Sequence, residues 1–385
     1  MHNSEKYGVL LLGGHRTHQE NYAHLFANDP RCQLIAFADE HDAPSERVKL
    51  ARSLAAELNL PFIDNLQDAL GRDDIHIVSL CTEVERRGQV GAKCADAGKH
   101  VYLDKPMALN PEHANQIVTA VANSSVRTQM FSNIHSMWAR TVKQVLESGR
   151  IGELKAIHCD VMFAKGHPGT APIGNKRIQR PNLERYSFVE AKPEMFDIGV
   201  YAVSMVSWLT QKRVKKVFCG TANYFFKEHY DCDLEDFGAM ILTCEDGMTA
   251  TIAAGRYGWQ SHPQGGVRKV HLVGTEATLT FDASSNRLEV FAAEPAFEPP
   301  TPHPLDPMGM WNSTTAETGM RPKQHWIDIA IHDDGQREFS AFVDCIENGV
   351  ESEMNAEFAA HAVEIICAGY ESAADGEIRD LSKTK

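Results

Sequence analysis

The first third of the chain alternates short apolar runs with segments of helical periodicity. The apolar runs lie at residues 7–12, 34–39, 62–63, 75–81, 100–103 and 128–131. The segments of helical periodicity lie between them, at residues 17–28, 45–58, 66–70, 86–97 and 111–123. Strands that alternate with helices of about 10 to 15 residues predict a parallel sheet with crossover helices on both faces.

The start of this pattern has the layout of a dinucleotide-binding unit. The first apolar run leads into the turn Gly13-Gly14-His15-Arg16, and the second run ends at Asp39. A glycine turn after the first strand and an acid at the end of the second are typical of a Rossmann domain. A carboxylate at Asp39 would accept hydrogen bonds from a ribose diol and repel a 2'-phosphate, which favours NAD over NADP.

The rest of the chain has a different pattern. Alternating or β-rich runs lie at residues 155–162, 214–222, 239–243, 249–254, 269–273, 278–281 and 287–291. They predict a large, mostly antiparallel sheet with one open face, interrupted by a helix at residues 193–209. Residues 292–325 are interpreted as a long irregular excursion, either a lid or an oligomer arm. We therefore predict an α/β chain with a Rossmann domain at residues 1–132 and an α+β substrate-binding and oligomerisation domain at residues 133–385.

Composition excludes several classes of function. The formal net charge of -14 argues against nucleic acid or an anionic membrane as the main partner. No apolar run approaches the roughly 20 residues that span a bilayer, and the absence of a secretory signal predicts a cytoplasmic location. Nine cysteines without a C-x-x-C pair are typical of reduced thiols. Three histidines and one aspartate could in principle ligate a metal: His158, Asp160, His167 and His229. Their spacings match no metal template, so no metal is expected.

The triplet Asp104-Lys105-Pro106 follows the fifth apolar run directly. Ligands of an open parallel sheet bind just beyond the carboxyl ends of its strands. A lysine fixed there can donate a hydrogen bond and a positive charge to a substrate oxygen as negative charge develops. Lys105 is therefore a candidate catalytic residue.

Five fragments, in order along the chain, resemble the motifs of the Gfo/Idh/MocA oxidoreductase family. They are Ala97-Gly-Lys-His-Val-Tyr-Leu-Asp-Lys-Pro106, Ser148-Gly-Arg-Ile-Gly-Glu-Leu154, Asp197-Ile-Gly-Val-Tyr201, Gly274-Thr-Glu-Ala-Thr-Leu279 and Ala368-Gly-Tyr-Glu-Ser372. The resemblance implies a Rossmann domain, a second domain on an open sheet, and an active site between them. It also implies a homodimer or homotetramer through the sheet face, and a small-molecule substrate such as a carbohydrate or polyol.

The resemblance implies roles for individual residues. Lys105 would hold the oxygen on the reacting carbon, Tyr201 would give a proton to that oxygen or take one from it, and Asp197 would orient the substrate hydroxyl. A nearby ammonium is expected to lower the pKa of the Tyr201 phenol. The cofactor-binding candidates are Gly13, Gly14, His15, Arg16, Asp39, Thr82, Lys105 and Pro106. The substrate-binding candidates are Asn133, His135, Arg177 and Arg180.

The chain departs from the family pattern at several positions. His15 and His18 replace the second and third glycines of G-x-G-x-x-G, and Glu83 follows Thr82 where the family has proline. Arg87 stands near the place of a usual histidine. Three hypotheses therefore stay open: an NAD-dependent dehydrogenase of sugars or polyols, a lyase or glycosidase-like enzyme without net redox that holds NAD tightly, and a binding or regulatory protein without catalysis.

Overall fold

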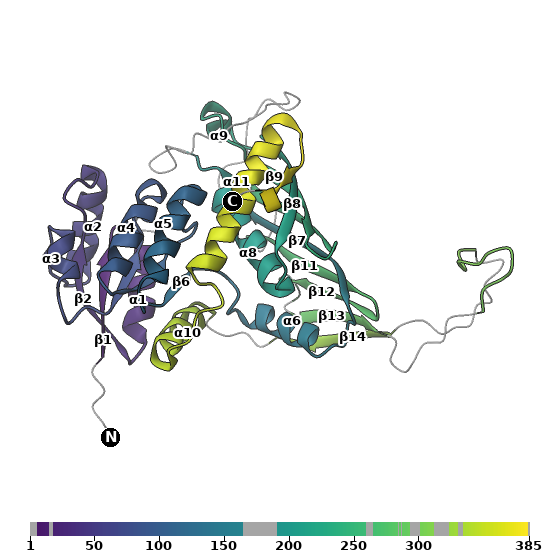
Figure 1. The fold of residues 1–385 in the computed structure, drawn as a ribbon, viewed down its shortest axis with the longest axis horizontal. Coiled ribbons are helices and arrows are strands. Elements are labelled where there is room, and N and C mark those ends of the chain that lie inside the picture. The colour runs from purple at the N-terminus through teal and green to yellow at the C-terminus, as the bar shows by residue number, and fades with distance from the viewer. Residues whose placement is uncertain are drawn as a thin grey trace, which may run out of the picture.

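Two sheets organise the chain, one in each half (Figure 1). The computed structural model describes residues 6–14, 18–164, 191–258, 265–283, 285, 287–292, 301–311, 323–329 and 334–383. None of the helices in these ranges combines the length and the apolar character that crossing a bilayer requires.

The first sheet is parallel throughout. Its strands are β1 (Tyr7–Leu12), β2 (Cys32–Ala38), β3 (Phe62–Ile63), β4 (Ile77–Leu80), β5 (His100–Leu103) and β6 (Thr128–Met130). The helices that connect them are α1 (Gln19–Asn28), α2 (Ser45–Glu57), α3 (Leu66–Leu70), α4 (Val84–Asp96) and α5 (Pro111–Ala122). The strand order is β3-β2-β1-β4-β5-β6, so the chain reverses its direction of travel across the sheet between β1 and β4. Ligands of such sheets bind at this switch point.

Burial explains why these short runs become central strands. Residues 9–12 of β1 are completely buried, with Leu10 and Leu12 in one hydrophobic cluster and Val9 and Leu11 in another. A strand that is covered on both faces is apolar at every position rather than at alternate ones. The predicted parallel sheet with helices on both faces is therefore confirmed.

The second sheet has nine strands in the order β14-β13-β12-β11-β7-β10-β9-β8-β15. They are β7 (Leu154–Ala164), β8 (Val214–Ala222), β9 (Phe237–Cys244), β10 (Thr249–Tyr257), β11 (Gly266–Gly274), β12 (Ala277–Asp282), β13 (Arg287–Ala292), β14 (Lys323–Asp328) and β15 (Arg379–Asp380). All neighbours pair antiparallel except β7 and β10, which pair in parallel. The prediction of a mostly antiparallel sheet is thus confirmed.

Helices cover one face of this sheet. The remaining helices are α6 (Met137–Glu147), α7 (Glu194–Asp197), α8 (Gly199–Thr210), α9 (Lys227–Asp231), α10 (Asp334–Asn348), α11 (Ala356–Asp375) and the 3-10 turn η1 (Leu381–Lys383). α8 is buried along most of its length and packs on β7 and β10, and α11 packs on β8 (Figure 1). Large apolar side chains such as Phe218, Ile241 and Trp326 stay 41–50% exposed.

Two details differ from the sequence-based expectation. The helix predicted at residues 193–209 is two helices, α7 and α8, which are separated at Ile198, where φ is -107°. β14 begins at Lys323, inside the segment interpreted as irregular, and extends the sheet beyond β13. The role of residues 292–325 as a lid or arm stays a prediction, and residues 293–300 and 312–322 lie outside the described residues.

Helix α10 returns to the first half of the chain. The Phe339 ring lies 4.3 Å from that of Tyr102 and 4.8 Å from that of Phe26, centroid to centroid. Glu338 is buried beside it and accepts hydrogen bonds from the backbone N (3.0 Å) and Oγ (3.1 Å) of Ser132. The predicted division at residues 132 and 133 therefore leaves out a helix that completes the N-terminal core.

Candidate active site

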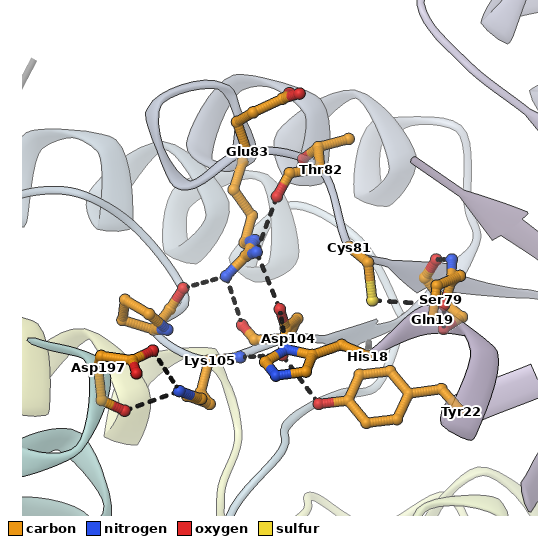
Figure 2. A network of polar contacts seen from close by, with 12 residues as sticks. His18, Gln19, Tyr22, Ser79, Cys81, Thr82, Glu83, Asp104, Lys105 and Asp197 are labelled. Carbon is orange, nitrogen blue, oxygen red and sulfur yellow. Dashed lines mark hydrogen bonds and ion pairs between the residues drawn. The ribbon is translucent and has the colours of Figure 1, made fainter. Parts of the chain in front are cut away.

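Lys105 lies just beyond the carboxyl end of β5 and reaches the second half of the chain. Its ammonium donates to the backbone oxygen and to Oδ1 of Asp197, both at 2.7 Å (Figure 2). Asp197 ends α7, so the pair joins the edge of the first sheet to the helical layer of the second. These two bonds use two of the three N–H groups of the ammonium.

The Lys105–Asp197 pair is charged. The Lys105 side chain is 4% exposed and that of Asp197 16%. Burial favours the neutral lysine, but Asp197, Tyr201 and Asp104 together outweigh it, with Asp197 contributing most, and raise the pKa of Lys105 above its usual value. Burial also opposes ionisation of Asp197, yet Lys105 holds the pKa of that carboxyl well below its usual range. The site thus presents an ammonium and a carboxylate at neutral pH.

Tyr201 lies on α8, and its ring centroid is 5.2 Å from Lys105 Nζ. Burial raises the pKa of Tyr201 to about 12, although the charge of Lys105 acts in the opposite direction. The expected net lowering of this pKa is wrong, because the phenol loses more solvation than the ammonium restores. The structure nevertheless brings the three predicted catalytic residues, Lys105, Asp197 and Tyr201, together.

Arg256 supports this group and is not among the site residues predicted from the sequence. It lies in β10 and donates from Nε to Glu194 Oε1 (2.8 Å) and from Nη2 to Asp197 Oδ2 (3.2 Å). Glu194 is 1% exposed, and its Oε1 also lies 2.9 Å from His229 Nε2. The Asp197 carboxylate is therefore held between two cations. An arginine in an apolar strand is a signal for such a role, but its partner is visible only in three dimensions.

Asp104 forms a second polar centre behind Lys105 (Figure 2). Its carboxylate accepts from Tyr22 Oη and from the backbone N of Lys105, both at 2.8 Å, and lies 3.1 Å from His18 Nδ1. Burial opposes its ionisation, but His18 and Arg87 lower the pKa of Asp104 well below its usual range. The histidine at the third-glycine position thus contacts the aspartate that precedes Lys105.

Arg87 ties the ends of β4 and β5 together. It is 3% exposed and donates to the backbone oxygens of Thr82 (2.7 Å), Asp104 (3.0 Å) and Pro106. It also donates to Asp104 Oδ2 at 3.1 Å. A planar guanidinium can fix several acceptors at once, so Arg87 positions the segment that carries Lys105.

The carboxyl edge of the first sheet offers groups that fit a dinucleotide. Gly13 and Gly14 turn the chain after β1 with φ of 63° and 126°, a region that favours glycine. A Cβ on Gly13 would lie 2.8 Å from Thr82 Cγ2, so the turn packs closely on the end of β4. Thr82 Oγ1 is buried and has no hydrogen-bond partner within the described part of the chain, which leaves it available to a ligand. His15 and Arg16, also predicted here, lie outside the described residues.

Asp39 is at the end of β2 as predicted, but its carboxylate already has a partner. It is 2% exposed, and Arg47 from α2 donates to it from Nε (3.0 Å) and Nη2 (2.6 Å). Burial raises the pKa of Asp39, while Arg47 acts against this shift. Each carboxylate oxygen has two lone pairs, so Asp39 retains the capacity to accept from a ribose hydroxyl.

The predicted substrate-binding residues separate into three groups. Asn133 lines a recess together with Tyr201 and Arg268. His135 faces elsewhere: its Nδ1 lies 2.6 Å from Arg140 Nη2, and burial lowers the pKa of His135 to about 4. Arg177 and Arg180 lie outside the described residues. All these substrate roles stay predictions.

The described residues contain no group of three or more His, Cys, Asp or Glu side chains placed to hold a metal ion. His158, considered above, lies 2.6 Å from Thr251 Oγ1. His229 contacts Glu194, as described. His167 lies outside the described residues.

Comparison with known proteins identifies the family. Residues 7–132 match the family model described as "Oxidoreductase family, NAD-binding Rossmann fold", and residues 139–280 match "GFO/IDH/MocA C-terminal domain". The chain therefore belongs to the GFO/IDH/MocA oxidoreductase family and carries its NAD-binding Rossmann fold. The predictions of the family, the fold and an oxidoreductase are confirmed.

Individual relatives are distant. The inositol 2-dehydrogenase of Rhizobium meliloti (strain 1021) is 21% identical over 344 residues, 89% of each chain. A glycosyl hydrolase family 109 protein of Shewanella sp. (strain W3-18-1) is 28% identical over 143 residues, 36% of this chain and 30% of that protein. A structure of levoglucosan dehydrogenase with NADH and levoglucosan superposes with a TM-score of 0.74 at 15% identity, covering 98% of this chain and 100% of that one.

Proposed function

We propose that the protein is an NAD-dependent dehydrogenase or reductase that acts on a hydroxyl or carbonyl group of a sugar or polyol. The observation that carries the proposal is the convergence of three groups. The Lys105 ammonium lies 2.7 Å from Asp197 Oδ1 and 5.2 Å from the centroid of the Tyr201 ring. The relation to inositol 2-dehydrogenase along 89% of the chain supports a polyhydroxylated substrate.

The charge of each residue suggests its role in the reaction. The third N–H of Lys105 would bind the reacting oxygen of the substrate and stabilise negative charge on it. Tyr201, with a pKa of about 12, holds its proton at neutral pH and would donate it to that oxygen during reduction. Asp197 would keep the ammonium charged and orient it.

The cofactor would lie along the carboxyl edge of the first sheet, against Gly13, Gly14 and Thr82. Asp39 would accept from a ribose hydroxyl. The nicotinamide supplies the hydride chemistry when NAD is bound. Pro106 and Lys105 follow β5 directly and would border the nicotinamide end, whereas Asp39 would mark the adenosine end.

A second candidate is a lyase or glycosidase-like enzyme that holds NAD tightly and catalyses no net oxidation. The observation that favours it is the 28% identity with a glycosyl hydrolase family 109 protein over 143 residues. The two candidates share the fold and differ in the fate of the cofactor.

The test begins with the nucleotide content of the denatured protein. Protein purified without nucleotide, which binds added NAD+ and reduces it with a panel of sugars and polyols, supports the dehydrogenase. Stoichiometric NAD in the extract, with no net reduction, supports the second candidate. A protein that binds no NAD+ by calorimetry contradicts both.

A matched pair of variants links activity to the site. Lys105→Met should reduce turnover by about 10²- to 10³-fold, the usual effect of removing one preorganised electrostatic donor. Lys155→Met removes a lysine that is 55% exposed and should leave turnover unchanged. Near-normal turnover by folded Lys105→Met would refute the assignment.

A further inference from the structure

The ribose-binding carboxylate of the first sheet is held by an arginine of the same chain. Arg47 is 1% exposed and faces Asp39 with both Nε and Nη2. An acid at this place in a Rossmann domain hydrogen-bonds the ribose 2'-OH of NAD, whereas an arginine nearby accommodates the 2'-phosphate of NADP. This chain has both groups, so the state of Arg47 decides which cofactor the site can accept.

A third residue holds the remaining side of the guanidinium. Glu83 immediately precedes α4, is 6% exposed, and contacts Arg47 Nη1 through Oε2. Because β1 lies between β2 and β4 in the sheet, the contact from Asp39 through Arg47 to Glu83 crosses the carboxyl end of β1. The glycine turn that would face the dinucleotide starts at this point.

Glu83 is also the residue that departs from the family's Thr-Pro pattern. Its second carboxylate oxygen, Oε1, is buried and has no hydrogen-bond partner among the described residues. Figure 2 shows Glu83 on the other side of the Asp104 network from the Lys105–Asp197 pair. Glu83 therefore acts at the end of the crevice away from the reacting groups.

The charges around Arg47 leave it little capacity for another anion. Its guanidinium contacts the carboxylates of Asp39, Glu40 (3.4 Å) and Glu83. Arg86 is bound to Glu40 as well, at 2.9 Å. A phosphate monoester carries about -1.5 to -2 charges at neutral pH. It would enter a cluster in which each of the three nitrogens of the Arg47 guanidinium already contacts a carboxylate.

We propose that Glu83 determines the cofactor preference by holding Arg47 against Asp39, so that the site accepts the ribose diol of NAD and excludes the 2'-phosphate of NADP. Glu83 is a positioning residue in this scheme, because it acts through Arg47. The inference rests on the proposed function. It adds that the preference depends on a carboxylate after β4 as well as on the acid after β2.

The experiment measures Kd for NAD+ and for NADP+ by calorimetry at constant ionic strength. The wild-type protein should bind NAD+ more tightly. Glu83→Gln keeps the size of the side chain but replaces the carboxylate with a neutral amide, which weakens its hold on Arg47 Nη1. The ratio of the two Kd values should then shift toward NADP+ by about ten- to a hundredfold, the effect of one hydrogen bond to a charged group. Asp42→Asn, which removes a 55% exposed partner of Arg86, should leave the ratio unchanged.

Two further variants keep the test decisive. Glu83→Pro introduces the family's residue at a position with φ of -54°, which proline adopts without strain, and should shift the ratio in the same direction. Adding Arg47→Gln to Glu83→Gln should abolish the gain in NADP+ affinity. Thermal melting of each variant shows whether it is folded.

The possible outcomes are distinguishable. A wild-type protein that binds NAD+, combined with an unchanged ratio in both Glu83 variants, refutes this inference and leaves the dehydrogenase assignment intact. A wild-type preference for NADP+ refutes this inference and the NAD preference in the proposed function, but leaves the roles of Lys105 and Tyr201 intact. Binding of neither dinucleotide refutes the proposed function and this inference together.

Discussion

Removing the charge of Asp197 should destabilise the protein more than removing its lysine partner. Asp197→Asn leaves the Lys105 ammonium buried without a carboxylate partner, although the backbone oxygen at residue 197 still accepts from it. Loss of one member of a buried ion pair costs about 3–5 kcal/mol. We expect the lower end, about 3 kcal/mol, because that backbone bond of 2.7 Å remains.

Lys105→Met, in contrast, leaves the charge that remains in the site with a partner. Arg256 still donates to Asp197 Oδ2 at 3.2 Å, so the carboxylate keeps a cationic partner. The expected cost is about 1.5–2 kcal/mol, the lower part of the range for a hydrogen bond to a charged group, because no isolated charge is left. The double variant should be less destabilised than the sum of the two single variants, because neither charge then lacks its partner.

The assay is equilibrium urea unfolding at pH 7, followed by tryptophan fluorescence. Asp231→Asn is the matched control, because it removes a 50% exposed aspartate from an i,i+4 surface pair and should change the midpoint very little. The reasoning is wrong if Asp197→Asn unfolds at the same urea concentration as this control, or if Lys105→Met is the less stable of the two single variants.

Two other predictions concern protons. Tyr201→Phe should lower kcat by about 10²- to 10⁴-fold with little change in KM, since general acid catalysis contributes that much; steady-state kinetics would exclude the proton-transfer role if kcat were unchanged. Burial raises the pKa of Glu338 to about 8 and that of Glu235 to about 7. The contribution of these protonated carboxyls to the free energy of unfolding is therefore fully present below about pH 4.5 and is lost as the pH rises through the raised values. Between pH 7 and 8 the free energy of unfolding should therefore fall with pH mainly because of Glu338, by at most about 1.4 kcal/mol per pH unit. Urea titrations should show a smaller fall for Glu338→Gln, and an unaltered fall would contradict the burial argument.

Much of the fold could be predicted because the strands of the first sheet are buried on both faces. Their apolar runs contrast clearly with the amphipathic segments between them. β14 could not be predicted in this way, because Lys323–Asp328 has no buried position and contains charged residues at both ends. Its pairing with β13 is a tertiary contact that leaves no periodic pattern in the sequence.

The site residues that belong to a sequence motif could be predicted. Lys105, Asp197 and Tyr201 stand in motifs that resemble those of the family, and the structure brings them together. Arg256 and Arg47 were missed because each is a single charged residue whose partners lie far away in sequence or on another element. The direction of the Tyr201 pKa shift was also missed, since the depth of burial of a side chain cannot be read from its neighbours in sequence.

The return of α10 has a consequence for how the protein can be divided. Rings that the N-terminal segment contributes, such as Tyr102 and Phe26, pack against a phenylalanine encoded more than two hundred positions later. A fragment that stops after the sixth strand would expose this aromatic cluster to water. We therefore expect a minimal version of the nucleotide-binding half to need two discontinuous stretches of the polypeptide.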